Sequence, residues 1–522
     1  MTAYDAIVVG GGHNGLVTAA VLAQAGLRTI VLERRPIAGG ATITEELHPG
    51  FHISTLAHAG QPAAAVLTKL RLADHGLQLI DPDPHLFVPL PDGRGLTLSR
   101  DTGASAASIA AFSAADSRRY LEFKDAIARI TPFISRMLEE TPPDIEQITA
   151  ADLWPLLKTA RRFRRLGKRD AYRLLRWAPM SAADFVSEWF ESEPLRASLA
   201  APGIFGTALG PRSAGSTAVL LLQLAVTQGT PRLVRGGLGA LADALSSAAR
   251  AAGAEIRTDA DVTRIDVLNG RVRGVTLASG EQLLARLVAS NADPRRTLLG
   301  LVDAIDLDPG FLARVRSYRC MGNVAKLNLA LSGLPQFRSG DDQSLRGRIH
   351  IGPSLEYLER AFDASKYGGY STRPWLDCTI PSLTDSALAP PGAHVMSINA
   401  MFAPYRLKGM DWPAAADAFA DVILDTLAEY APDIRRLIVH RQLITPADLE
   451  SRYGLTGGHI FHGELALDQL FTMRPLLGWA RYRTPVAGLY LCGSGTHPGY
   501  GVSGQSGLNA GGEILADLQR ST

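Results

Sequence analysis

The residues with the clearest chemical pattern are three glycines near the amino terminus, Gly10, Gly12 and Gly15. The first permits a tight turn, the second lets a pyrophosphate approach the backbone, and the third lets a helix pack closely on a strand. Glu33 follows these glycines at the sequence separation that is typical of the acid that binds the ribose hydroxyls of a dinucleotide. Its negative charge would repel a 2′-phosphate. The spacing therefore predicts a site for an adenine dinucleotide that lacks a 2′-phosphate.

The segments around these glycines have the patterns that such a site requires. Residues 6–9 are a β-branched, apolar run typical of a buried parallel strand, and apolar residues then recur at helical spacing from Asn14 to Gly26. A second apolar run over 29–32 ends at Glu33. A strand before the glycines, a helix after them and an acid at the end of the next strand predict a βαβ unit rather than an unrelated glycine-rich turn.

Two further glycine-rich segments could complete this site. Gly39 and Gly40 follow Glu33 closely, and near the other end of the chain an apolar run over 488–493 leads into the glycine-rich residues 494–504. A helical pattern over 505–518 comes next. Because a glycine-rich turn before a helix favours anions, two such surfaces suit a ligand with a long, extended middle.

These motifs resemble the phytoene desaturase and amine oxidase superfamily, whose members bind FAD where the two chain ends meet, and within it a branch named for a pyridine nucleotide-disulfide oxidoreductase domain. The resemblance covers nearly the whole chain and rests on residues 10–16 (GGGHNGL), 39–51 (GGATITEELHPGF), 453–462 (YGLTGGHIFH), 467–470 (LDQL) and 489–498 (LYLCGSGTHP). The residues that we expect to bind FAD are Gly10, Gly12, Asn14, Gly15, Glu33, Arg34, Gly39, Gly40, Ala41, Thr42, Val262, Gly493, Ser494, Gly501 and Val502.

The sequence departs from the superfamily pattern at two positions. Ala41 stands where these proteins usually have arginine, and Ser494 stands where many have an acid. We therefore expect the polar contacts to the pyrophosphate and ribityl groups to differ in detail. The cysteines, Cys320, Cys378 and Cys492, form no close pair in the sequence, so the disulfide part of the branch name receives no support.

The resemblance implies an α/β fold in which a Rossmann-like, glutathione-reductase-like FAD-binding domain is interrupted by an α+β substrate or cap domain. We expect residues 1–100, 226–300 and 456–522 to form the FAD-binding domain, 101–225 a helical cap or membrane-facing region, and 301–455 the substrate domain. Within 226–300, the pattern predicts a helix over 240–252 and strands over 262–268 and 272–277, joined at Asn269-Gly270. The resemblance places the backbone of Val262 near the adenine.

A flavin that accepts a hydride usually needs a proton acceptor near the substrate. The candidates are His58, Lys326, His459, His462, Glu464, Asp468 and Arg474. For each of them a hydrogen-bonded structural role or a surface position is favoured over catalysis, so the sequence singles out no catalytic residue. Residues 459–464 lack the His-Glu-x-x-His spacing of helical zinc sites, and no metal site is predicted.

Composition and charge limit the partners of this protein. At 46% hydrophobic and 20% charged residues the chain is typical of globular proteins, and 53 basic against 51 acidic residues are too balanced for a general nucleic-acid-binding surface. Between Lys158 and Arg176, however, nine residues are basic and one is acidic. The apolar residues between 156 and 178 recur every three or four positions, which predicts a basic amphipathic helix that could contact an anionic membrane, the cap or another subunit.

No apolar run reaches the roughly 18–20 residues of a membrane-spanning helix, and no targeting segment precedes the first strand. We therefore expect a cytoplasmic location. The sequence leaves open whether the basic helix associates with a membrane, and it does not indicate the oligomeric state. The expected function is dehydrogenation of a largely apolar, isoprenoid-like substrate with hydride transfer to FAD; oxygen, a quinone or nicotinamide could be the final acceptor. The alternatives are a redox-neutral isomerase or cyclase, and a flavoprotein whose main role is to bind a partner or membrane.

Overall fold

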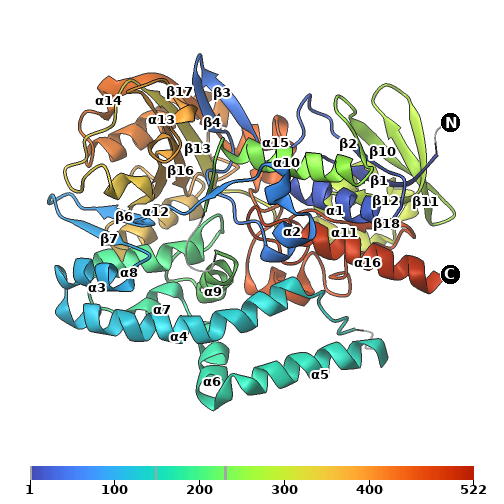
Figure 1. Cartoon of the computed structure of the whole chain (residues 1–522), viewed down its shortest axis with the longest axis horizontal. Coiled ribbons are helices and arrows are strands. Elements are labelled where there is room, and N and C mark those ends of the chain that lie inside the picture. The colour runs from blue at the N-terminus through green and yellow to red at the C-terminus, as the bar shows by residue number, and fades with distance from the viewer. Residues whose placement is uncertain (1–2, 147–149, 228–231, 522) are drawn as a thin grey trace.

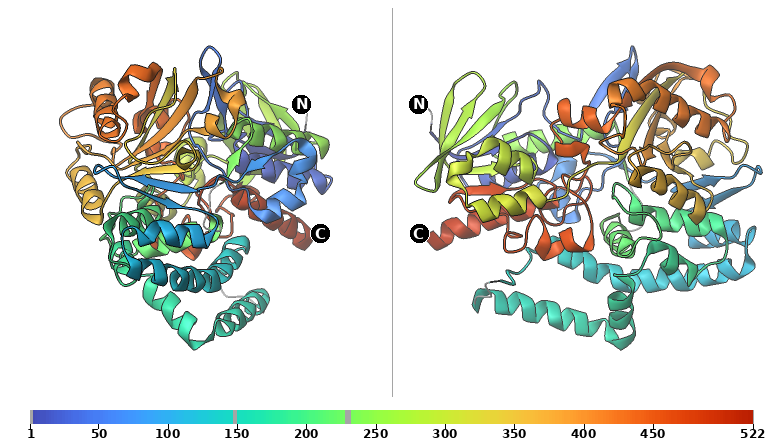
Figure 2. Two further views of the ribbon diagram at one scale, coloured as in Figure 1. Left: turned by 60° about the vertical axis from the view of Figure 1, so that its left-hand side comes forward. Right: turned by 180° about the vertical axis from the view of Figure 1, so that it is seen from behind.

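The structure, a computed structural model, describes residues 3–146, 150–227 and 232–521. These residues form two sheets side by side, with a layer of helices below the second sheet in the view of Figure 1. Both chain ends lie beside the first sheet, as the view from behind in Figure 2 also shows.

The first sheet contains the predicted βαβ unit. Its strand order is β10-β11-β12-β1-β2-β9, and β18 pairs with β12. All of its pairs are parallel except β10 with β11 and β11 with β12. The strands are β1 (Ala3–Val9), β2 (Thr29–Leu32), β9 (Glu255–Arg257), β10 (Val262–Leu268), β11 (Arg271–Leu277), β12 (Gln282–Ser290) and β18 (Leu489–Leu491).

Helices cover both faces of this sheet, which explains why its central strands are continuous apolar runs. One face packs against α1 (His13–Gln24), α10 (Leu238–Ala251) and α16 (Gln505–Ser521). The other face packs against α11 (Pro309–Ser317). Helices from the start, middle and end of the chain therefore share one core.

The second sheet has the order β17-β13-β16-β15-β14-β6-β7. Its strands are β6 (Leu86–Pro89), β7 (Gly95–Leu98), β13 (Val324–Leu331), β14 (Arg348–Ile351), β15 (Leu376–Thr379), β16 (His394–Met401) and β17 (Ile438–Ile444). Leu327 and Leu329 of β13 belong to the core that also contains Phe419 of α13 (Trp412–Ala428). Because side chains alternate along a strand, Lys326 and Asn328 face the opposite side.

A helical region lies below the second sheet in Figure 1. It consists of α3 (Thr102–Ala110), α4 (Ala114–Glu139), α5 (Ala150–Arg165), α6 (Gly167–Trp177), α7 (Ala182–Ser187), α8 (Glu193–Ala200) and α9 (Ser216–Thr227). The shorter remaining elements are α2 (Ala64–Lys69), α12 (Leu355–Lys366), α14 (Ile434–Leu437), α15 (Pro446–Ser451), β3 (Thr44–His48), β4 (Phe51–Ser54), β5 (Leu79–Ile80) and β8 (Leu233–Val234).

The predicted basic helix over 156–178 is in fact two helices. Gly167 has a φ of +77°, which right-handed helices do not accommodate, so α5 ends at Arg165 and α6 begins in a new direction. Together they form an arm that extends below α4 in Figure 1, and Arg129 of α4 contacts Asp170 of α6 at 2.8 Å. We call residues 150–177 the basic arm.

The predicted α/β fold with a Rossmann-like unit is confirmed, as are the helix near 240–252 and the hairpin at Asn269-Gly270, where both residues have positive φ. Two strands of the predicted 1–100 segment, β6 and β7, pair within the second sheet rather than the first. The domain boundaries otherwise stay a prediction, and residues 228–231 of the 226–300 segment lie outside the described residues. In the described part of the chain, no helix is both long and apolar enough to cross a bilayer.

Candidate functional site

The first glycine motif forms a turn between β1 and α1 that a side chain would obstruct. Gly10 has a φ of +94°, and a Cβ on Gly12 would lie 2.6 Å from the Asn291 Nδ2 atom. A Cβ on Gly15 would meet the Gly10 carbonyl oxygen. Gly12 is also the N-cap of α1 and supplies no side-chain cap, so the first N–H groups of this helix remain available to an anionic ligand.

Glu33 at the end of β2 holds this turn in place. Its Oε2 atom accepts a hydrogen bond of 2.8 Å from the Gly11 N–H, and its Oε1 atom accepts one of 3.0 Å from the Arg35 N–H. Each carboxylate oxygen has two lone pairs, so acceptor capacity remains for the hydroxyls of a ribose.

The second glycine motif lies directly against the first. The Gly39 N–H donates to the Gly11 carbonyl oxygen at 2.8 Å, and a Cβ on Gly40 would lie 2.9 Å from the Gly12 Cα. The φ of Gly40 is +59°, which favours glycine. Two backbone segments without side chains thus meet where the phosphates of a dinucleotide are expected.

The carboxyl-terminal segment joins the same site through Asn14. Its Nδ2 atom donates to the Ser494 Oγ at 3.1 Å, and its Oδ1 atom accepts from the Gly507 N–H at 3.3 Å. The Thr18 hydroxyl donates to the Gly507 carbonyl oxygen at 3.0 Å. These contacts join residues that are far apart in the sequence, as the superfamily resemblance implies.

Arg474 organises the loops near Ser494 from within the protein. Its side chain is fully buried and its Nη2 atom donates to the carbonyl oxygens of Ser494 at 2.7 Å and Phe461 at 2.8 Å. Burial lowers the pKa of this guanidinium. Arg474 is therefore a structural link between the segment around Phe461 and the carboxyl-terminal glycine segment, and it does not line the cavity.

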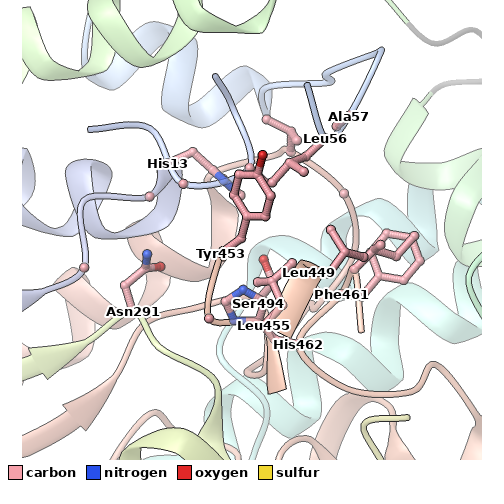
Figure 3. A pocket seen from close by; sticks show the side chains of 18 of the residues that line it. His13, Leu56, Ala57, Asn291, Leu449, Tyr453, Leu455, Phe461, His462 and Ser494 are labelled. Carbon is pink, nitrogen blue, oxygen red and sulfur yellow. The ribbon is translucent and has the colours of Figure 1, made fainter. Parts of the chain in front are cut away.

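One cavity is lined both by these glycines and by residues of the second sheet such as Lys326, and Figure 3 shows part of it. The predicted FAD-binding residues that line it are Gly10, Gly12, Glu33, Arg34, Gly40, Ala41, Val262, Ser494, Gly501 and Val502. The others, Asn14, Gly15, Gly39, Thr42 and Gly493, lie behind the wall; Thr42, for example, donates to the Gly39 carbonyl oxygen at 2.6 Å.

The wall of the cavity contains polar atoms that lack a hydrogen-bond partner. Gln61 Oε1, Gln223 Nε2 and His462 Nδ1 are buried and have no hydrogen-bond partner among the described residues. Such atoms are costly to leave unpaired. An extended dinucleotide carries donors and acceptors along its length, so the residues present fit the predicted cofactor.

The far end of the cavity contains a group of buried and half-buried polar residues that we call the buried cluster: His58, Lys326, Arg348, Asp377 and Asn399. Asp377 Oδ1 accepts hydrogen bonds from Arg348 at 2.7 and 2.8 Å, and Asp377 Oδ2 lies 3.2 Å from His58 Nε2. Lys326 Nζ and Asn399 Nδ2 lie 3.3 and 3.4 Å from His58 Nδ1. This arrangement requires the proton of His58 on Nε2 and a free lone pair on Nδ1.

Burial and neighbouring charges set the protonation states of the cluster. Burial lowers the pKa of His58 to about 4, further aided by Lys326. Burial alone would raise the pKa of Asp377, but Arg348 and His58 outweigh it and hold that pKa well below its usual range. Burial lowers the pKa of Lys326 to about 7, although Asp377 opposes this. Near neutral pH, Asp377 and Arg348 are therefore charged, His58 is neutral, and Lys326 is close to its midpoint.

Neighbouring strands of the second sheet bring the cluster together. Asn399 of β16 lies opposite Lys326 of β13 and also opposite Asp377 of β15. Lys326 and His58 are among the candidates expected from the sequence, whereas Asp377, Arg348 and Asn399 are not. Polar residues alternate with apolar ones in these otherwise buried strands, which indicates a polar face but not which residues meet on it.

Aromatic and aliphatic side chains form the wall between the glycines and the buried cluster. The rings of Phe461 and Tyr500 are 5.1 Å apart, and those of Phe205 and Phe461 are 6.2 Å apart. Figure 3 shows Leu56, Tyr453 and Phe461 around the same cavity. Further apolar lining residues are Val226, Val324, Leu449, Leu455 and Ile460.

The other candidates from the sequence have structural partners. Glu464 and Asp468 both accept hydrogen bonds from Arg319 and lie outside the cavity wall. His459 Nδ1 accepts the Phe461 N–H at 3.2 Å, and His462 does line the cavity. No group of three or more His, Cys, Asp or Glu side chains that could bind a metal occurs within the described ranges.

Comparison with known proteins gives consistent matches over nearly the full length. The model of a family described as flavin containing amine oxidoreductase matches residues 15–515. The chain is 38% identical over 550 residues to pyridine nucleotide-disulfide oxidoreductase domain-containing protein 2 of Rattus norvegicus, covering 99% of this chain and 94% of that protein. It is 27% identical over 536 residues to a neurosporene-forming phytoene desaturase of Cereibacter sphaeroides, covering 98% and 94%.

Among solved structures, the fold is similar to that of an oxidoreductase from Methanosarcina mazei. The TM-score is 0.61 at 17% sequence identity, and the match covers 98% of this chain and 100% of the other.

Proposed function

Because this chain belongs to the flavin-containing amine oxidoreductase family, we propose that it dehydrogenates a largely apolar, isoprenoid-like substrate. The family membership confirms the predicted superfamily, and the protein is an FAD-dependent oxidoreductase. The substrate class is the part that we propose.

The observation that carries this proposal is the apolar wall between the glycine turns and the buried cluster. A substrate in this cavity would contact Phe205, Phe461 and Tyr500, which offer large apolar surfaces. Burial of such surface stabilises an apolar ligand by about 25 cal/mol per Å². The similarity to a phytoene desaturase, a protein named for an isoprenoid, supports the same class.

The residues of this chain then have distinct tasks. Gly12, Gly40 and the amino terminus of α1 hold the phosphates, and Glu33 holds the ribose. FAD held by these residues would supply the hydride-accepting chemistry of the dehydrogenation. The apolar wall orients the substrate and excludes water, and the buried cluster fixes polar groups at the far end of the cavity.

An anaerobic single-turnover experiment tests this proposal. Phytoene, supplied in vesicles to the FAD-loaded enzyme without oxygen, should bleach the flavin absorbance lastingly and gain a double bond, which mass spectrometry would detect. An unchanged flavin with a rearranged product would instead support the redox-neutral isomerase or cyclase alternative. An unchanged flavin and intact substrate for phytoene and for shorter isoprenoids would refute the substrate class.

We propose a second role for the basic arm, which is docking on an anionic membrane. Trp154 and Leu157 of α5 are 74% and 61% exposed, and Tyr172 and Leu175 of α6 are 67% and 66% exposed. Exposed apolar side chains beside a dense cluster of arginines and lysines suit the interface of an anionic bilayer. A membrane would also supply an apolar substrate.

Vesicle binding tests this role. Replacing Arg161, Arg162, Arg164 and Arg165 with glutamine should weaken binding to phosphatidylglycerol vesicles by roughly 100- to 1000-fold, since each basic residue contributes about 1 kcal/mol. The matched control replaces four exposed arginines elsewhere, Arg271, Arg273, Arg314 and Arg316. Equal binding by both variants would contradict the proposal.

A further inference from the structure

We propose that the buried cluster binds a carboxylate of the substrate through Lys326, so that the enzyme takes an apolar acid rather than an amine. This inference deepens the proposed dehydrogenase function and rests on it. It concerns the far end of the cavity, away from the glycine turns that hold the cofactor.

The first observation is the unused hydrogen-bonding capacity of Lys326. Its side chain is only 3% exposed and lines the cavity, and among the described residues its Nζ atom has one hydrogen-bond partner, His58 Nδ1 at 3.3 Å. An ammonium group has three N–H donors, so two remain. A buried ammonium without acceptors is costly, and an acceptor in the cavity would remove that cost.

The second observation is the charge balance around Lys326. Two hydrogen bonds from Arg348 already neutralise Asp377, and His58 is uncharged near neutral pH. Protonated Lys326 therefore leaves the cluster with one net positive charge. A carboxylate of the ligand would balance it, whereas an ammonium would meet a like charge.

Groups from every neighbouring element affect the protonation of Lys326. His58 follows β4, Arg348 lies on β14, Asp377 and Cys378 lie on β15, and Tyr500 of the carboxyl-terminal loop interacts electrostatically with Arg348 and Asp377. Burial raises the pKa values of Cys378 and Tyr500, so both stay neutral below pH 9. Lys326 is thus the group that changes charge near neutrality, with a pKa of about 7.

Three ligands with one isoprenoid body and different ends test the inference. Geranate is an anion, methyl geranate is neutral, and geranylamine is a cation. Their dissociation constants for the FAD-loaded enzyme can be measured by calorimetry and by perturbation of the flavin spectrum, without turnover. We expect geranate to bind at least about tenfold more tightly than the ester, and geranylamine most weakly.

Two variants assign the effect to Lys326. Lys326→Met should weaken geranate binding by at least about tenfold and leave methyl geranate nearly unchanged. Lys124→Met is the matched control, since burial also lowers the pKa of Lys124 but it lies outside this cavity; it should leave geranate binding unchanged. FAD content and thermal unfolding show whether each variant is folded.

The pH dependence of the wild-type protein gives a second measurement that needs no variant. Geranate affinity should be highest between about pH 5.5 and 6.5, above the range in which the geranate carboxylate takes up a proton, and should fall by about tenfold per pH unit above pH 7, because Lys326 loses its charge. Tighter binding of geranylamine or of the ester, or affinity that is flat through pH 9, would overturn the inference. If geranate binds as expected but no isoprenoid ever reduces the flavin, the dehydrogenase proposal fails and this inference survives.

Discussion

Replacing Glu33 with glutamine should weaken FAD binding strongly while leaving the fold intact. In the native chain, both carboxylate oxygens accept backbone N–H groups, from Gly11 at 2.8 Å and Arg35 at 3.0 Å. A glutamine can accept only one of these, because its amide nitrogen is a donor. The carboxylate is also the expected acceptor for the ribose hydroxyls, and a hydrogen bond to a charged group contributes about 1.5–3 kcal/mol, so loss of one such bond should raise the dissociation constant for FAD by roughly 10- to 150-fold.

The assay is titration of FAD-free protein with FAD, followed by the quenching of flavin fluorescence. Asp261→Asn is the matched control, because Asp261 lines the same end of the cavity and the substitution removes the same charge. If long-range charge were the cause, both variants would weaken FAD binding equally. A dissociation constant for Glu33→Gln within twofold of the native value would refute the assigned role of the carboxylate.

Gly12→Ala should lose most bound FAD, by about 1–3 kcal/mol of binding energy, because its Cβ would lie 2.6 Å from Asn291 Nδ2; full flavin absorbance of the purified variant would contradict this. Lys326→Met should stabilise the protein by about 1–4 kcal/mol at pH 7, since the native lysine has a folded pKa of about 7, below its unfolded value of roughly 10.4. Lys326 holds its proton more tightly in the unfolded chain, so the stability that the variant gains should shrink as the pH rises from 7 to 10. The free energies of unfolding in urea measure this gain, and a gain that grows with pH would contradict the prediction. Arg474→Lys should cost about 2–5 kcal/mol, because a single ammonium group cannot reach the carbonyl oxygens of Phe461, Glu464 and Ser494 at once, and each buried acceptor left unsatisfied costs about 1–3 kcal/mol; an unchanged urea midpoint would refute this.

The sequence was sufficient to predict the dinucleotide-binding half of the fold because its signals are local. The glycines at 10, 12 and 15 stand between a β-branched run and a helical pattern, and Asn269-Gly270 marks a hairpin through two residues with positive φ. Each of these patterns depends on backbone conformation within a few residues. These patterns can therefore be recognised from a short stretch of sequence, without knowledge of the rest of the chain.

The buried cluster could not be predicted in the same way. Asp377 and Arg348 occupy strands whose pairing order, β13-β16-β15-β14, differs from their order in the sequence. His58 comes from a loop more than 260 positions from Lys326. Only tertiary pairing brings these residues together, and an isolated Asp or Arg in a short apolar run resembles the edge of a strand. The basic arm was mistaken for one helix because helical periodicity continues through Gly167, where the backbone does not.

The contact between Asn14 and Ser494 spans 480 positions, so the nucleotide pocket cannot be finished until Ser494 has left the ribosome. At a synthesis rate of about 5–20 residues per second, roughly 24–96 seconds pass between the synthesis of the amino-terminal turn and that of the carboxyl-terminal segment that contacts it. During this time its apolar helix α1 lacks one of the two helices that cover it. A chain that stops before α16 would lack Gly507, whose backbone groups form hydrogen bonds with Asn14 and Thr18, so binding of FAD would depend on synthesis through this helix.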